Sequence, residues 1–180
     1  MLGLPGAGVS VAFEVSRELV RSVPGTGQCP AVTVRADDPA VEAGWGHPAA
    51  AGRNAIVVGV QEPAAAADPL LEFAFTTAEL HGTRVHAVRA LAPVDPRTVG
   101  ERARLTARPA PWRDKFPDVP VVEQVTSGPA AQVLLSAATH SQLTVVGRRR
   151  HPSRPAWKLG PVAHATLHHV PGPVAVVPHD

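Results

Sequence analysis

The stretch that decides the fold is Leu143–Val177, LTVVGRRRHPSRPAWKLGPVAHATLHHVPGPVAVV. It predicts a buried strand over Leu143–Val146, a basic loop, a short helix that begins at Gly160, and a last strand over Val174–Val177. A glycine directly after a strand, such as Gly147, and another at a helix start mark the usual ligand crevice of an open α/β sheet. Backbone N–H groups and the helix N-terminus favour an anion there. The stretch therefore predicts an α/β fold with a candidate anion site.

The preceding residues repeat this alternation of strand and helix. Strands are predicted over 55–60, 84–90, 119–126, 143–146 and 174–177, and helices that begin at Asp68–Pro69, Thr98, Gly128–Pro129 and Gly160–Pro161. The helix that begins at Thr98 should run to about Phe116, and Pro109 and Pro111 should kink or split it. Strand and helix alternate five times, so the predicted fold class is α/β: a five-stranded parallel, Rossmann-like sheet with helices on both faces.

The N-terminal residues form a weak internal repeat. Ser10–Ser22 has helical spacing and Ala31–Arg35 reads as a strand, a pair that resembles the last helix and strand of the chain. We interpret residues 1–35 as the remnant of a first copy of the domain, residues 36–52 as a linker, and residues 53–180 as the full domain. The remnant strand should then lie antiparallel beside Val174–Val177 and cover that edge of the sheet.

Composition narrows the class of protein. The 180 residues are 44% hydrophobic and 18% charged, which is typical of one globular domain. A net charge of +2, no Tyr and few aromatic residues argue against nucleic-acid binding. The single Cys29 fits a reducing compartment, and no apolar run reaches membrane-spanning length. We expect a cytoplasmic protein without a signal peptide or membrane contact.

The ordered motifs resemble the universal stress protein family. They are IVVGV at 56–60, LLEFAF at 70–75, HGTRVHAVRAL at 81–91, PWRDKFPDVPV at 111–121, VTSGPAAQVLLSAA at 125–138, LTVVGRR at 143–149 and LHHVPGPVAVVPH at 167–179. The resemblance covers Asn54–Pro178 and implies a five-stranded parallel α/β fold. It also implies dimers that pair through their last strands, so we expect a homodimer or an intrachain pseudo-dimer through residues 174–177, with the protein partner unknown.

Some members of this family bind ATP, and the resemblance identifies the residues that would take part. The binding branch carries a loop of glycine, two residues, glycine, nine residues, then glycine followed by Ser or Thr, and an aspartate just after the first strand. If a nucleotide binds at all, the matching residues here are Val60, Gln61, Gly147, Arg148 and Gly160.

Three positions depart from that pattern. Arg150 stands at the second glycine and places a bulky side chain where backbone should approach phosphate. Pro161 replaces the hydroxyl residue and offers neither an N–H nor an O–H donor. Gln61 replaces the aspartate and removes a charged acceptor. Together they argue against ATP, so no cofactor is expected, with ATP as the alternative.

Two clusters allow a second interpretation. The first is a basic group that could hold an anion with guanidinium forks. We favour the interpretation that it is a solvated face, as charge runs usually are. Its members are Arg148, Arg149, Arg150, His151, Arg154 and Lys158. His164 and His168 have a spacing that suits a metal, but no Cys or carboxylate neighbours them, and surface histidines are favoured.

The sequence contains no recognisable catalytic set, so we expect no enzyme. The leading hypothesis is a stress-response or regulatory protein that acts through association. The alternative is a sensor that binds an adenine nucleotide or another phosphate ligand at the Gly147–Gly160 loop.

Overall fold

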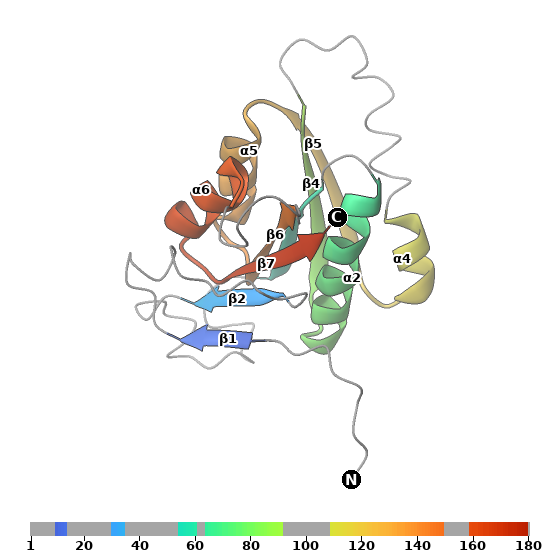
Figure 1. Cartoon of the computed structure of the whole chain (residues 1–180). Helices are drawn as coiled ribbons and strands as arrows, with labels where there is room; N and C mark the ends of the chain where they lie inside the picture. Colours follow the sequence, from blue (N-terminus) through green and yellow to red (C-terminus); the bar gives the residue numbers. More distant parts are fainter. Residues whose placement is uncertain are drawn as a thin grey trace.

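The computed structural model describes residues 10–13, 30–34, 54–60, 64–91, 109–149 and 159–179. These residues form a seven-stranded sheet with a pair of helices on each face (Figure 1). The strands are β1 (Ser10–Phe13), β2 (Ala31–Val34), β3 (Ala55–Gly59), β4 (Arg84–Leu91), β5 (Val121–Ser127), β6 (Leu143–Arg149) and β7 (Val174–His179). The helices are α2 (Ala64–Leu80), α4 (Ala110–Lys115), α5 (Ala130–Ala138) and α6 (Pro161–His169).

The predicted parallel sheet is confirmed. Five strands run in the order β7-β6-β3-β4-β5, and every neighbouring pair among them is parallel. The central strands read as continuous apolar runs because helices cover both faces of the sheet. Along β3 the side chains of Ile56 and Val58 therefore join one core cluster, whereas that of Val57 joins the other.

The two core clusters correspond to the two helix layers. On one face α2 contributes Leu71 and Phe75, and α4 packs beside it. On the other face α5 contributes Val133 and Leu134, and α6 contributes Leu167. These residues are buried against the sheet, whereas Ala130 at the start of α5 is exposed.

Helix α2 begins earlier than the Asp68–Pro69 pair that was predicted to start it. The helix starts at Ala64 and includes Pro69 within it. A run of alanines, the strongest helix former, carries the helix across the proline at the cost of one backbone hydrogen bond. The helix ends before Gly82, which has φ +59°, and Thr83 N–H donates to the carbonyl of Ala78. This pairing is the Schellman motif, in which glycine accepts the left-handed conformation without strain.

Two prolines lie at the start of helix α4. Pro109 is the N-cap and Pro111 lies in the first turn, where a missing N–H removes no helical bond. The rest of the predicted helical region, residues 98–108, lies outside the described residues. Trp112 and Phe116 pack against Phe75 of α2, with ring centroids 6.4 and 5.8 Å away. The two aromatic side chains thus pack against the core on this face.

The predicted helix over Ser10–Ser22 is wrong at its start. Ser10–Phe13 is strand β1, which pairs parallel with β2, while residues 14–22 lie outside the described part of the chain. The backbone partners that β2 offers override a weak helical spacing in this short segment. The predicted strand at Ala31 is confirmed as β2, which runs antiparallel to β7 with Val32 opposite Ala175.

The β2–β7 pair lies at the centre of a symmetric arrangement. From β1 to β6 the neighbouring strands are parallel, then antiparallel, then parallel. Val32 and Val34 of β2 are buried in the same cluster as α2. β2 therefore covers the edge of β7 with both backbone hydrogen bonds and apolar side chains.

We expect the removal of residues 1–36 to expose the β7 edge and to produce oligomers or aggregates, because a flat apolar edge strand pairs with other chains. Light scattering coupled to size-exclusion chromatography measures this against the full chain. A matched deletion of residues 1–9, which retains β1 and β2, should behave as the full chain does. A stable monomer of residues 37–180 would contradict the role given to β2.

Candidate functional site

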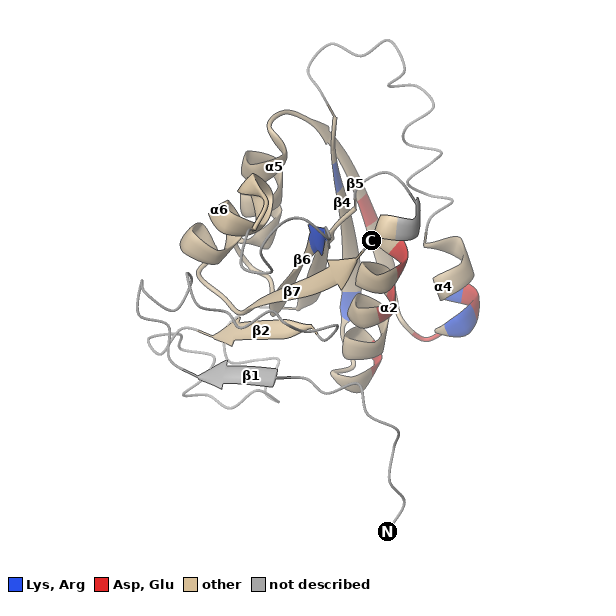
Figure 2. Cartoon of the chain, in the orientation of Figure 1, with Lys and Arg blue, Asp and Glu red and all other residues tan. Residues whose placement is uncertain are grey.

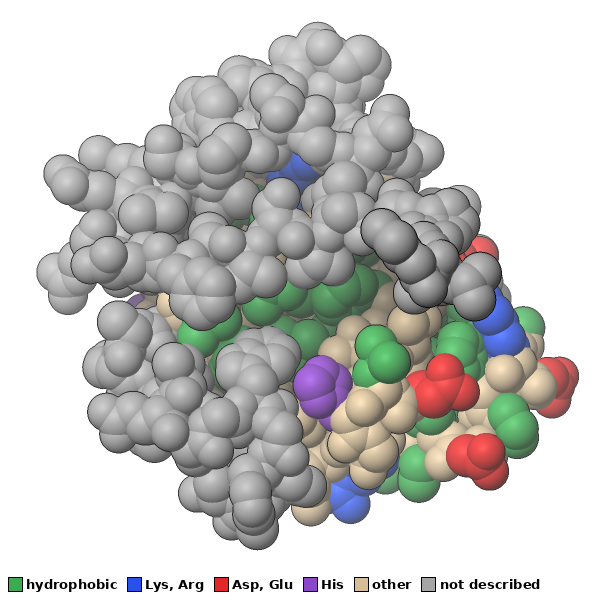
Figure 3. Space-filling model, turned by 90° about the horizontal axis from the view of Figure 1, so that it is seen from below, with side chains coloured by type: hydrophobic (Ala, Val, Ile, Leu, Met, Phe, Trp, Pro, Cys, Tyr) green, Lys and Arg blue, Asp and Glu red, His purple; other side chains and the backbone are tan. Residues whose placement is uncertain are grey.

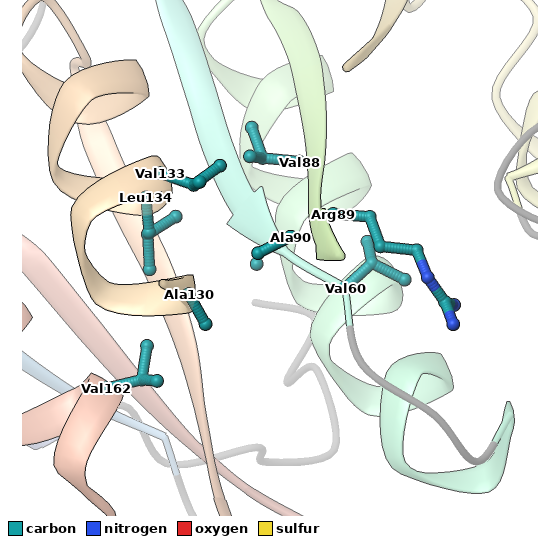
Figure 4. Close-up of a pocket in the computed structure, with 9 residues that line it drawn as sticks. Val60, Val88, Arg89, Ala90, Ala130, Val133, Leu134 and Val162 are labelled. Carbon is teal, nitrogen blue, oxygen red and sulfur yellow. The ribbon is translucent and has the colours of Figure 1, made fainter. Parts of the chain in front are cut away.

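An open pocket lies at the carboxyl ends of β3 and β4, between the sheet and helices α5 and α6 (Figure 4). Its volume is about 180 Å³. The strands contribute Gly59, Val60, Val88, Arg89 and Ala90, and the helices contribute Ala130, Val133, Leu134 and Val162. This is the place where open α/β sheets bind ligands.

The pocket walls are apolar apart from Arg89. Because side chains alternate along a strand, Val88 and Ala90 face the pocket while Arg89 faces the α2 side of the sheet. Figure 4 shows the Arg89 side chain extending away from α5 and α6. Arg89 as a whole is 8% exposed. Apart from Arg89, the described side chains that line the pocket are therefore apolar and include no acid, base or nucleophile.

The structure places Gly147 inside a strand and not in a loop. β6 continues to Arg149, and Gly147, Arg148 and Arg149 lie opposite Val177, Pro178 and His179 of β7. The predicted basic loop from Arg148 is therefore wrong at its first two residues, because β7 is long enough to give them backbone partners. Arg150–Lys158 lies outside the described residues.

Gly147 lies in close contact with other side chains on the α2 side of the sheet. A Cβ added to Gly147 would lie 2.8 Å from two atoms of the His179 ring and 3.3 Å from Leu70 of α2. His179 itself is 6% exposed. The pocket lies on the opposite side of the sheet, beside α5 and α6. A packed imidazole thus explains this glycine without any ligand.

Gly160 is the N-cap of α6, with ordinary extended backbone (φ −69°, ψ 162°), and a Cβ there would meet nothing within 4 Å. Pro161 is the first helical residue, so the helix N-terminus lacks one N–H donor. Of the predicted site residues, Val60 lines the pocket, whereas Gly147, Arg148 and Gly160 are not among its lining residues. Gln61 lies outside the described part of the chain.

Most pocket residues were missed because the sequence search followed the glycine loop. The carboxyl end of β4 and the start of α5 supply much of the lining, including Val88, Ala90 and Ala130. The strand predictions could have identified them. Neighbouring parallel strands end at the same edge of the sheet, so the residues after each strand are candidates for the ligand site.

Helices α5 and α6, beside this pocket, contain no Lys, Arg, Asp or Glu (Figure 2). On the other half of the molecule Arg113 forms an ion pair with Glu123, and Lys115 Nζ lies 3.3 Å from Glu72 Oε1. Figure 3, seen from below, shows the acidic side chains on one side and hydrophobic side chains at the centre.

His86 on β4 has a lowered pKa, and it lies outside the pocket. Burial lowers the pKa of His86 on β4; the charge of Arg84 lowers it further, against a hydrogen bond with Gln124 that raises it. His86 is thus held in the neutral form near pH 7. Among the described residues no group of three or more His, Cys, Asp or Glu side chains could hold a metal ion. No helix in the described ranges is long and apolar enough to cross a membrane.

Comparison with known sequences identifies one protein family. A model described as the universal stress protein family matches residues 52–178. A universal stress protein of Mycobacterium tuberculosis is 28% identical over 181 residues, and one of Mycobacterium bovis matches equally. Each match covers 98% of this chain and 60% of the relative. The chain therefore spans 60% of the length of these relatives.

Solved structures show the same fold. A universal stress protein from Archaeoglobus fulgidus superposes with a TM-score of 0.65 at 15% identity, covering 95% of this chain and 60% of that one. A universal stress protein in complex with cAMP gives 0.58 at 18% identity, and one from Archaeoglobus fulgidus in complex with dAMP gives 0.54 at 20%. Both complexes cover 71% of this chain and 98% of their own.

We expect Gly147→Ala to destabilise the fold by roughly 1–3 kcal/mol, the usual cost of overpacking. Urea denaturation followed by circular dichroism measures the change. In a His179→Ala background the same substitution should cost clearly less, because the obstructing ring is gone. Equal costs in the two backgrounds would mean that His179 is not the reason for the glycine.

Proposed function

Because this chain belongs to the universal stress protein family, which matches residues 52–178, we propose that it is a non-enzymatic stress-response or regulatory protein that acts by association and does not use the family's ATP loop. The observation that carries the proposal is the character of the pocket at the carboxyl ends of β3 and β4. Its described lining is apolar, apart from one arginine that points away.

The size and chemistry of the pocket support a role without catalysis. A volume of about 180 Å³ is below the roughly 300–1,000 Å³ of most small-molecule sites. ATP hydrolysis needs metal ligands and a group that positions or activates water. No such group lines the described pocket, and the described residues hold no metal-ligand cluster.

The phosphate end of the family site is also weakened. Pro161 at the start of α6 removes a backbone donor from the helix N-terminus. The sequence adds Arg150 at a glycine position and Gln61 at the aspartate position. Gly147, the glycine that fits the family pattern, is accounted for by the His179 ring.

The pairing of β2 with the edge of β7 supports an intrachain pseudo-dimer. In our proposal residues 1–35 are the end of a preceding domain copy, residues 36–52 are a linker, and residues 53–180 are the full domain. Structures covering 71% of this chain match over 98% of their own length, whereas those covering 95% match over only 60%. This difference supports a second copy in the longer relatives, and β2 would then replace a dimer partner's last strand.

The second candidate function is a sensor for an adenine nucleotide or another phosphate ligand. The position of the pocket favours it, because α/β sheets bind ligands at this edge. Two structures with this fold hold cAMP and dAMP. The pocket would supply an apolar slot for a base, with the phosphate directed toward Gly160.

Isothermal titration calorimetry with ATP and with cAMP separates the two functions. We expect no heat from the native chain at millimolar ligand. The triple variant Gln61→Asp, Arg150→Gly, Pro161→Ser restores the family pattern and should bind ATP with a Kd below about 1 mM, or about −4 kcal/mol.

A fourth substitution, Ala130→Phe, serves as the control. It adds bulk to the pocket at an exposed helix position and should remove the restored binding. Submillimolar binding of ATP or cAMP by the native chain would instead favour the sensor.

A further inference from the structure

The outer side of helix α6 carries two adjacent imidazoles. His164 and His168 lie one turn apart, and their ring centroids are 4.4 Å apart with 48° between the planes. His164 is exposed and His168 is half-buried. From this geometry we propose that the pair is half of a divalent transition-metal site and that a second copy of this chain supplies the other half.

The separation of the rings fits a shared metal ion. Zinc binds histidine nitrogens at about 2.0–2.1 Å, so two imidazoles on one tetrahedral ion have centroids about 5 Å apart. The observed 4.4 Å differs from this value by a small side-chain rotation, which the exposed His164 is able to make.

Helix α6 holds the pair on a fixed support. Ala163, Thr166 and Leu167 are buried against the sheet, and Thr166 Oγ1 donates to the carbonyl of Val162 at 2.8 Å. Residues four apart on such a helix point the same way. Ligands on a packed helix keep their relative positions better than ligands on a loop.

One chain does not complete the coordination within its described residues. Zinc sites with protein ligands use three or four of them, and the described residues contain no third His, Cys, Asp or Glu in a metal-binding group. Two copies related by a two-fold axis would present the same pair twice, which gives four imidazoles around one ion. The second copy therefore contributes ligands and not just contact area.

The surface around the pair allows this approach. Neither α5 nor α6 contains a Lys, Arg, Asp or Glu, as Figure 2 shows by the absence of blue and red on both helices. Two α6 helices would thus meet without repulsion between fixed like charges. Depletion of charged residues is also the compositional mark of interface cores.

The test uses the tag-free full chain with Zn²⁺ as the probe. Sedimentation velocity should show a dimer when zinc is added and a monomer after chelation, and calorimetry should give one zinc ion per two chains. His164→Ala and His168→Ala should each weaken zinc binding roughly tenfold or more and abolish the dimer. His140→Ala, at an exposed histidine after α5, should change neither result.

Circular dichroism melting tests whether each variant is folded. We expect folded variants, because His164 is exposed and alanine has a high helix propensity. Three results would overturn the site: no zinc-dependent change in mass, one zinc ion per monomer without a dimer, or undiminished zinc-dependent dimer in the His164→Ala, His168→Ala double variant.

Discussion

The antiparallel pairing of β2 with β7 is the constraint on which the rest of the sheet depends. β7 is buried along its whole length, with α6 on one face and α2 on the other. A strand that is apolar on both faces leaves an edge of unpaired N–H and C=O groups unless another strand pairs with it. Because β2 supplies that partner within the same chain, the hydrogen-bonded sheet extends past β7 to β1.

The parts of the structure that could be predicted are those that depend on local sequence and not on a distant partner such as β2. Apolar runs predicted all five parallel strands, and Gly82 ends α2 with a positive φ, as glycine does at many helix ends. These features depend on local sequence. The N-terminal helix was predicted wrongly because Ser10–Phe13 takes its structure from β2, a partner distant in sequence. The start of α2 was predicted wrongly at Asp68–Pro69, because the alanines before Pro69 extend the helix toward its N-terminus.

The candidate site shows the same division. Val60 was predictable, since it follows directly after an apolar strand that ends at the ligand edge of the sheet. The other walls of the pocket come from β4, α5 and α6, and their proximity follows from the order of strands in the sheet. Gly147 was predicted for a reason that belongs to ligand-binding relatives, whereas here a side chain from β7 lies against it. In this chain the motif glycine therefore has a neighbouring side chain that the motif itself does not predict.

The contact between Gly147 and His179 has a consequence for how related sequences are compared. A glycine at this point of β6 has two separate physical causes: a phosphate that approaches the backbone, or an imidazole that packs on it. The two causes leave different traces in a family, because the second couples the glycine to the residue near the end of β7. Where that residue is small, a glycine in β6 points to a ligand; where it is a histidine, the glycine carries no information about nucleotides.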